Sequence, residues 1–420
     1  MPVRAPLNRT LVAAACALLA CAAQAQSSPF YFRASETLTY DSNVFRVPET
    51  LGRNRDGISS TNLTVGIDQP YGRQRWLGSA GITYNKFKNQ DQLDNTGYDL
   101  LLGLDWSALS RLSGDVRLES TQQLANFENY GAQFTVDKTK NQERANNLNL
   151  RAQYGGQSLW VLEGSFAHRD VNYSDPLFDS REYRFDQVGA GAAYQPSDLL
   201  KLGIAARYAD GTYPHGGNNG GADKFRRDDV DLTATWKASG LSTLDARVSA
   251  THENHDLDLR DFSGVTGSVG WNYRPTGKTA IDLRLSRDTG TRGNGAPVLV
   301  DPAISTNFLT DARLSDRIYA GVRWEATGKI TLRAQADYSH DRYDEQFFAV
   351  NPGIVTNIPG GGSGNTRNYL VGVAYQATRT VSLGCDAGKR SRSTPVVLAG
   401  NVGYGYDATI AHCNIALMLQ

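Results

Sequence analysis

Apolar and polar residues alternate with a period of two along most of the chain beyond residue 30. In one clear case Tyr98, Leu100, Leu102, Leu104 and Trp106 are separated by polar or small residues. Such alternation is typical of β-strands with one apolar face. It returns in many further segments, among them residues 148–154, 200–208, 230–236, 244–250, 330–338 and 369–375. The pattern predicts an all-β protein.

The face opposite the apolar one carries charges in the middle of the strands, including Asp99, Arg117, Glu163, Arg207 and Asp282. A soluble β-solenoid would bury this face and could not tolerate so many charges there. A WD40-type propeller needs four strands per repeat, whereas these repeats contain two. In a transmembrane barrel the apolar face meets lipid and the charged face meets water. We therefore expect a transmembrane antiparallel up-and-down β-barrel.

Short polar turns follow an aromatic residue at regular intervals. These aromatic residues are expected to form one girdle at the periplasmic interface, where Trp and Tyr suit the lipid headgroup region. They are Trp106, Tyr154, Tyr194, Trp236, Tyr273, Trp324 and Tyr375. The opposite strand ends carry long polar or glycine-rich loops, at residues 127–142, 210–224, 289–308 and 344–365.

Counting the alternating segments gives about 18 strands, and about 16 also fits the pattern. An even number returns both termini to the periplasmic side. Barrels of this size leave an aqueous channel rather than a packed interior.

The composition excludes two other classes of protein. The 420 residues include 43 basic and 43 acidic side chains, so no basic excess favours nucleic-acid binding. The longest apolar run, residues 11–23, is shorter than the roughly 20 residues that a membrane-spanning helix needs.

The first 25 residues have the pattern of a secretory signal peptide. Arg4 and Arg9 precede the apolar run, and Ala23, Gln24 and Ala25 form a small-residue cleavage site. We expect residues 1–25 to be removed and residues 26–420 to form a single outer-membrane barrel domain. The alternative is lipid attachment at Cys21, although the later cleavage site is better placed.

Two cysteines, Cys385 and Cys413, remain after the signal peptide. They lie at equal distances on either side of the centre of the last expected hairpin, which makes them cross-strand neighbours in an oxidising compartment. A disulfide between them is one interpretation, and two small apolar residues facing lipid is the other.

Residues 38–46, with the sequence LTYDSNVFR, resemble the start of the EpsL-type proteins of bacterial exopolysaccharide operons. The aromatic-turn repeats over the rest of the chain fit the same porin-like family. The resemblance implies a barrel in the outer membrane of a Gram-negative bacterium that passes or supports secretion of an extracellular polysaccharide. It also implies outer-membrane lipid, the polysaccharide and periplasmic export components as partners.

No residue pattern indicates catalysis, a metal or a cofactor. The densest group of candidate side chains, His252, Glu253 and His255, resembles a zinc motif only if it is helical. On a strand the two imidazoles point to opposite faces, and we expect this segment to be a solvated loop. The chain is therefore not expected to be an enzyme.

The interior of the barrel is the remaining candidate site. Its mid-strand arginines either brace the wall against carboxylates of neighbouring strands or contact a passing sugar polymer. They are Arg117, Arg151, Arg169, Arg207, Arg247, Arg284, Arg323 and Arg333. Because acidic residues match them in number, we expect weak ion selectivity. The alternatives to export are a general or sugar-uptake porin, and a structural or adhesive barrel plugged by the loop at residues 360–364.

Overall fold

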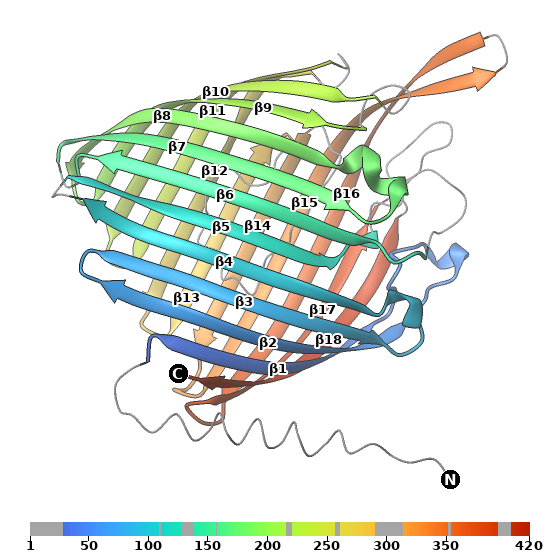
Figure 1. Cartoon of the computed structure of the whole chain (residues 1–420), viewed down its shortest axis with the longest axis horizontal. Helices are drawn as coiled ribbons and strands as arrows, with labels where there is room; N and C mark the ends of the chain where they lie inside the picture. Colours follow the sequence, from blue (N-terminus) through green and yellow to red (C-terminus); the bar gives the residue numbers. More distant parts are fainter. Residues whose placement is uncertain are drawn as a thin grey trace.

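The computed structural model describes residues 28–108, 111–127, 138–156, 158–215, 221–256, 261–289, 314–351, 354–393 and 405–420. These residues form one antiparallel sheet of 18 strands in which each strand pairs with its neighbours in sequence. The first strand also pairs with the last, so the sheet closes into a barrel (Figure 1). The predicted fold class and strand number are confirmed.

The strands are β1 (Phe30–Asp41), β2 (Asp56–Tyr71), β3 (Gln74–Phe87), β4 (Asn95–Ala108), β5 (Leu112–Leu124), β6 (Gln142–Tyr154), β7 (Trp160–Tyr173), β8 (Tyr183–Ser197), β9 (Leu200–Tyr213), β10 (Asp223–Ser239), β11 (Ser242–His255), β12 (Phe262–Thr276), β13 (Thr279–Asp288), β14 (Leu314–Glu325), β15 (Ile330–Asn351), β16 (Ile354–Gln376), β17 (Val381–Arg392) and β18 (Tyr406–Leu419). Short 3-10 helices are η1 (Glu49–Leu51), η2 (Asp91–Leu93) and η4 (Pro176–Arg181). Among the described residues, no helix has the length and apolarity to cross a membrane.

The two ends of the barrel differ. One end, at the left of Figure 1, carries the short turns, such as the turn from Tyr71 to Gln74 in which Gly72 adopts a φ of 61°. The first and last strands also meet there, with Phe32 opposite Leu419. The other end carries η1, η2 and η4. We call these the short-turn end and the loop end.

The outward face of the barrel is apolar across its middle. The large exposed apolar side chains alternate along the strands, as Leu202, Ile204 and Tyr208 do along β9. The outward span of β1, from Phe30 to Tyr40, covers roughly 33 Å along the strand, and a strand tilt of about 40° reduces this to about 25 Å. That height matches the apolar band of outer-membrane barrels.

Aromatic belts border the apolar band at both ends. All seven predicted girdle residues lie near the short turns, and exposed Trp76 and Trp160 extend that belt. The second belt was not predicted, and its exposed members include Tyr40, Tyr84, Tyr208 and Tyr369. Two belts fit two lipid–water interfaces.

Glu36 is an outward-facing carboxylate inside the apolar band, between Ala34 and Leu38 on β1. Its two carboxylate oxygens accept hydrogen bonds from Ser59 Oγ at 2.5 Å and Thr61 Oγ1 at 2.6 Å. These local donors satisfy the carboxylate where lipid offers none.

Two small apolar clusters lie inside the loop end. One joins Val44, Phe45 and Val47 to Phe87, Leu93 and Phe127. The other includes Tyr183, Phe185 and Phe225.

Within the second cluster, ring contacts connect Tyr183 to Tyr213 at 5.6 Å, Tyr213 to Phe225 at 5.8 Å, and Phe225 to His255 at 5.3 Å. Tyr183 and Phe185 thus belong to a continuous group of buried rings at the loop end.

Residues 41–46 of the LTYDSNVFR segment form a largely buried turn that ties the first strand to the last. Two guanidinium nitrogens of Arg46 donate to the two carboxylate oxygens of Asp41, at 2.8 and 2.7 Å. The side-chain amide of Asn43 donates to the carbonyls of Val47 at 2.7 Å and Asp407 at 3.0 Å. Phe45, only 1% exposed, anchors the turn in the first apolar cluster.

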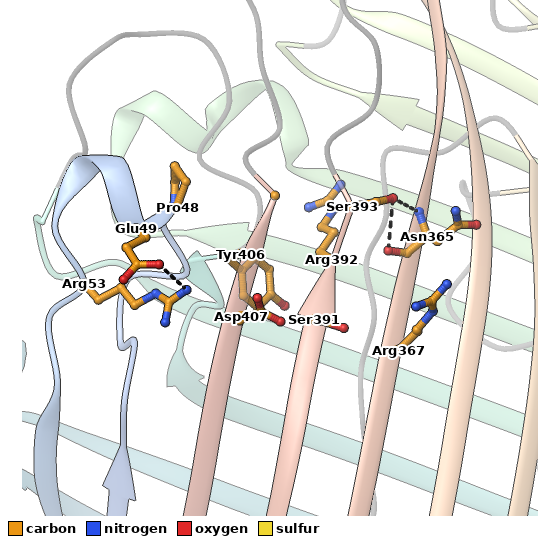
Figure 2. A pocket seen from close by; sticks show the side chains of 11 residues that line it. Pro48, Glu49, Arg53, Asn365, Arg367, Ser391, Arg392, Ser393, Tyr406 and Asp407 are labelled. Atoms are coloured by element: carbon orange, nitrogen blue, oxygen red, sulfur yellow. Dashed lines mark hydrogen bonds and ion pairs between the residues drawn. The ribbon is translucent and has the colours of Figure 1, made fainter.

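A cleft lies beside this turn, between η1 and the loop-end segments of β16, β17 and β18 (Figure 2). Its volume is about 420 Å³. Arg53 and Glu49 line one side, and Asn365, Arg367 and Ser391 line the other.

A long loop was predicted at residues 344–365, but residues 344–351 and 354–365 instead continue the hairpin of β15 and β16. Glu345 pairs with Gly360, and the two strands project beyond the barrel at the loop end (Figure 1). The glycine-rich stretch at residues 360–364 is therefore part of a strand, and the proposal that it folds inward as a plug is wrong. The predicted signal peptide, residues 290–308 and much of 127–142 lie outside the described residues.

Candidate functional site

All eight predicted arginines lie on the inner face, because each alternates with outward-facing neighbours, which are apolar or small for all but Arg169. Arg117 lies between Val116 and Leu118, and Arg207 lies between Ala206 and Tyr208. The structure divides these arginines into braced and unbraced groups.

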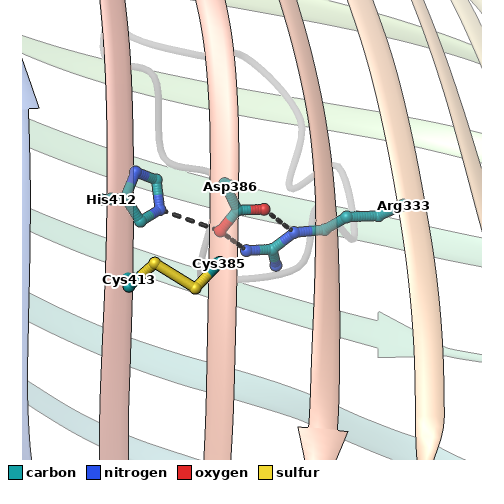
Figure 3. The surroundings of a disulfide bond; sticks show 5 residues. All are labelled: Arg333, Cys385, Asp386, His412 and Cys413. Carbon is teal, nitrogen blue, oxygen red and sulfur yellow. Dashed lines mark hydrogen bonds and ion pairs between the residues drawn. A yellow bond between two sulfur atoms is a disulfide. The ribbon is translucent and has the colours of Figure 1, made fainter.

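Arg333 is a braced arginine (Figure 3). It belongs to β15 and reaches across β16 to Asp386 of β17, with Nε 2.5 Å from Oδ1. The space for this crossing comes from Gly372 of β16, where a Cβ atom would collide with the Asp386 carboxylate. His412 of β18 completes the ladder, with Nε2 2.9 Å from the other Asp386 oxygen. One buried carboxylate thus connects three strands.

Arg207 and Arg247 belong to a larger network on β9, β10 and β11. Arg207 Nε lies 2.5 Å from Asp231 and a terminal nitrogen lies 3.3 Å from Asp229. Arg247 lies 3.7 Å from the same Asp231 and 3.3 Å from Asp288 of β13. The shared carboxylates hold these strands in register at the inner face.

Arg227, which was not predicted, is the centre of this network. Its side chain is 3% exposed and contacts Asp229 at 2.9 Å, Glu253 at 3.3 Å and Asp288 at 2.9 Å. The sequence did contain a signal, because Arg227, Asp229 and Asp231 repeat at the strand period. Their partners on β11 and β13 could not be inferred from that period.

His255 extends the network to the rim. Its imidazole is 1% exposed, with Nδ1 3.1 Å from Asp223 and Nε2 3.1 Å from Glu253. The expectation of a solvated loop here is wrong, because β11 continues to His255 and cross-strand side chains cover it. His252 faces outward and contacts Asn254 at 3.1 Å. The two imidazoles therefore lie on opposite faces.

Arg117 is braced locally by Asp105 of the adjacent strand β4. Arg169 is 8% exposed, and its guanidinium lies 5.9 Å from the ring centre of Tyr183 in the buried aromatic group. These two arginines therefore also support the wall.

Three predicted arginines remain unbraced. Arg151 and Arg323 are exposed to the interior and Arg284 is half-buried. None of the three makes an ion pair or side-chain hydrogen bond with the residues that the structure describes. Their guanidinium groups are therefore available to a solute in the interior.

A disulfide joins Cys385 of β17 to Cys413 of β18 on the lipid-facing side (Figure 3). The two residues are direct cross-strand partners, with a Cα–Cα distance of 4.1 Å. Asp386 and His412, their neighbours in sequence, lie on the inner face, because successive side chains of a strand point to opposite faces. A disulfide thus joins the two strands of this hairpin on the outer face, and the Asp386–His412 contact joins them on the inner face.

The part of the chain that the structure describes contains no group of three His, Cys, Asp or Glu side chains arranged to hold a metal ion. Several carboxylates of the inner wall, among them Asp229, Asp231 and Asp386, contact arginines instead.

No protein-family model matches this chain, and no curated protein matches it in sequence. Among solved structures, OpdO from Pseudomonas aeruginosa aligns with a TM-score of 0.44 and 12% identity, over 93% of this chain and 96% of that one. OpdK from Pseudomonas aeruginosa gives a TM-score of 0.45 and 12% identity, over 93% and 99%. The siderophore receptor PirA from Acinetobacter baumannii gives 0.43 and 8%, over 94% and 81%.

The barrel's own construction places it in a membrane. A closed sheet leaves no strand edge unpaired in lipid, and every backbone polar group of the band can bond to a neighbouring strand. The apolar band suits the hydrocarbon layer of a bilayer, and the two aromatic belts suit its two interfaces with water. The chain is an 18-stranded β-barrel of the Gram-negative outer membrane.

Proposed function

We propose that this barrel is a channel that passes or supports secretion of an extracellular polysaccharide. The observation that carries the proposal is the division of the inner wall into braced and unbraced arginines. Braced pairs fix the width of the lumen, while Arg151, Arg284 and Arg323 keep guanidinium groups available. A guanidinium fork binds carboxylate in two parallel hydrogen bonds, so these groups suit the acidic sugars of a moving polymer.

The LTYDSNVFR resemblance supports the choice of polysaccharide and of the export direction. It adds periplasmic export components as partners, and the short-turn end is where they would approach the barrel. A general or sugar-uptake porin could use the same wall, so the experiment must separate the two directions.

The experiment compares a deletion strain complemented with wild type, with the Arg151→Ala/Arg284→Ala/Arg323→Ala variant, and with the matching Arg→Lys variant. We expect the alanine variant to lower secreted polysaccharide while uptake of small sugars stays unchanged. The lysine variant keeps the charge but loses the fork, so it should recover secretion only in part. Reduced sugar uptake with normal secretion would instead support the uptake porin.

Planar-bilayer recording of the purified protein separates a channel from a plugged structural or adhesive barrel. Discrete open events are expected. Their absence in a correctly folded preparation would contradict both channel interpretations.

A further inference from the structure

The outward face of β13–β18 becomes basic just beyond the apolar band, at the loop end. Of the side chains described there, four are basic and two are acidic: Arg287, Arg342, Arg367, Lys389, Asp316 and Asp407. The same level of β7–β10 has no such excess, since Asp170, Asp186, Asp210 and Asp228 face outward beside Arg184, Lys224 and Arg226. The basic region therefore occupies one side of the barrel.

The position of these residues along their strands indicates which layer of the bilayer they face. Arg367 is the next outward residue after Tyr369, which is 53% exposed in the loop-end aromatic belt. On the adjacent strand His340 and then Arg342 follow Tyr338 on the outward face. Aromatic belts mark the headgroup region of a bilayer, so these arginines lie at the level of the outer-leaflet headgroups.

The cleft of Figure 2 opens at this level. Arg367 makes no ion pair or side-chain hydrogen bond with the described residues, and the hydroxyls of Ser391 and Ser393 lie nearby in the cleft lining. The two acids of the cleft lining are only loosely engaged, with Glu49 3.4 Å from Arg53 and Asp407 3.7 Å from Lys389, while Asp316 of the adjoining row is held by Arg287 at 2.5 Å. The cleft thus offers one available guanidinium among hydroxyl groups.

We propose that this cleft and the adjoining basic row bind the phosphorylated sugar headgroup of an outer-leaflet glycolipid. Phosphate matches the guanidinium fork, and sugar hydroxyls match Ser391, Ser393 and Asn365. An exported polymer is the weaker candidate ligand, because Arg367 and Ser391 lie on the lipid-facing side of the wall rather than in the lumen. The proposal does not depend on what the lumen transports.

The test uses the full-length protein in detergent and two probes, bisphosphorylated lipid A and its dephosphorylated form. Native mass spectrometry measures the lipid retained by wild type, by Arg367→Ala, and by the control Arg226→Ala on β10, outside the basic region. Arg226 is a suitable control because it is outward-facing, exposed and loosely paired, 3.5 Å from Asp210. Heat-modifiable gel migration establishes that each variant is folded.

We expect wild type and Arg226→Ala to retain the bisphosphorylated lipid, and Arg367→Ala to bind it about tenfold more weakly, the effect of losing one charge-assisted hydrogen bond. Arg367→Lys should recover part of the affinity. Equal binding by Arg367→Ala and wild type would overturn the proposal, as would equal retention of the dephosphorylated lipid. Displacement of the lipid by a soluble alginate oligosaccharide would overturn the glycolipid assignment in favour of an acidic polymer.

Discussion

A missing side chain, at Gly372, makes one of the longer braces of the inner wall possible. Arg333 and Asp386 lie on strands that are not adjacent, and any Cβ atom on the strand between them would occupy their contact. The carboxylate is 1% exposed, so its charge depends on Arg333 and His412 for compensation.

Arg333→Ala is expected to destabilise the barrel by about 2–3 kcal/mol, because it leaves a buried carboxylate with one partner fewer. Equilibrium unfolding in urea from lipid vesicles measures this change. Arg323→Ala is the matched control, since Arg323 lies opposite Arg333 on β14 and has no ion pair among the described residues. An equal loss in both variants would show that the Asp386 contact contributes nothing.

Gly372→Ala is expected to destabilise the wild-type barrel but to cost much less in the Arg333→Ala background. In the wild type the added methyl group disrupts the Arg333–Asp386 pair. In the Arg333→Ala background this pair is already absent, so the two changes should not be additive. A double-mutant cycle from the same unfolding measurements gives the coupling free energy. Strict additivity would mean that the methyl group is accommodated without disturbing the pair.

Among the elements, the final hairpin is unusual because both of its faces are cross-linked. The Cys385–Cys413 disulfide closes a sequence separation of 28 residues on the lipid side, while Asp386 and His412 interact on the inner side. β18 also has to pair with β1 to close the barrel. A disulfide that joins β17 to β18 restricts the unfolded hairpin before that closure.

Replacing both cysteines by serine is expected to lower stability by roughly 3 kcal/mol, the usual effect of losing a loop of this size. The measurement is urea unfolding of the oxidised wild type and the Cys385→Ser/Cys413→Ser variant. Wild type treated with reductant should unfold like the variant. Unfolding midpoints that do not differ would argue against a stabilising role.

At the scale of the whole molecule, the barrel separates its side-chain chemistry into layers. Lipid meets the apolar band, ion pairs line the wall, and aromatic and aliphatic clusters fill the rim of the loop end. The buried network around Arg227 carries more carboxylates than arginines, whereas Arg151, Arg284 and Arg323 carry unpaired positive charge. The negative charge of the network and the positive charge of the three arginines oppose each other in the lumen.

Reversal potentials in a salt gradient should therefore show weak ion selectivity for the wild-type channel. Arg284→Glu should shift the channel towards cations, since it replaces an available positive charge by a negative one. Arg333→Gln, which also removes a charge, frees the Asp386 carboxylate from its pair and should shift selectivity in the same direction. Strong wild-type preference for one sign would contradict the balanced lumen.

The sequence alone determined the all-β barrel, the strand number, the short-turn girdle and the inward direction of all eight arginines. These properties follow from the alternation of apolar and polar residues with a period of two. This alternation belongs to each strand by itself and does not depend on how neighbouring strands are aligned. Tertiary structure decided which arginines are braced, because each partner depends on neighbouring strands and on their stagger. Arg227 and Asp288 meet across 61 residues of sequence, and Arg333 meets Asp386 only because Gly372 leaves room. The buried state of His255 and the extended hairpin at residues 344–365 were missed for the same reason, since polarity cannot distinguish a solvated loop from a strand covered by its neighbours.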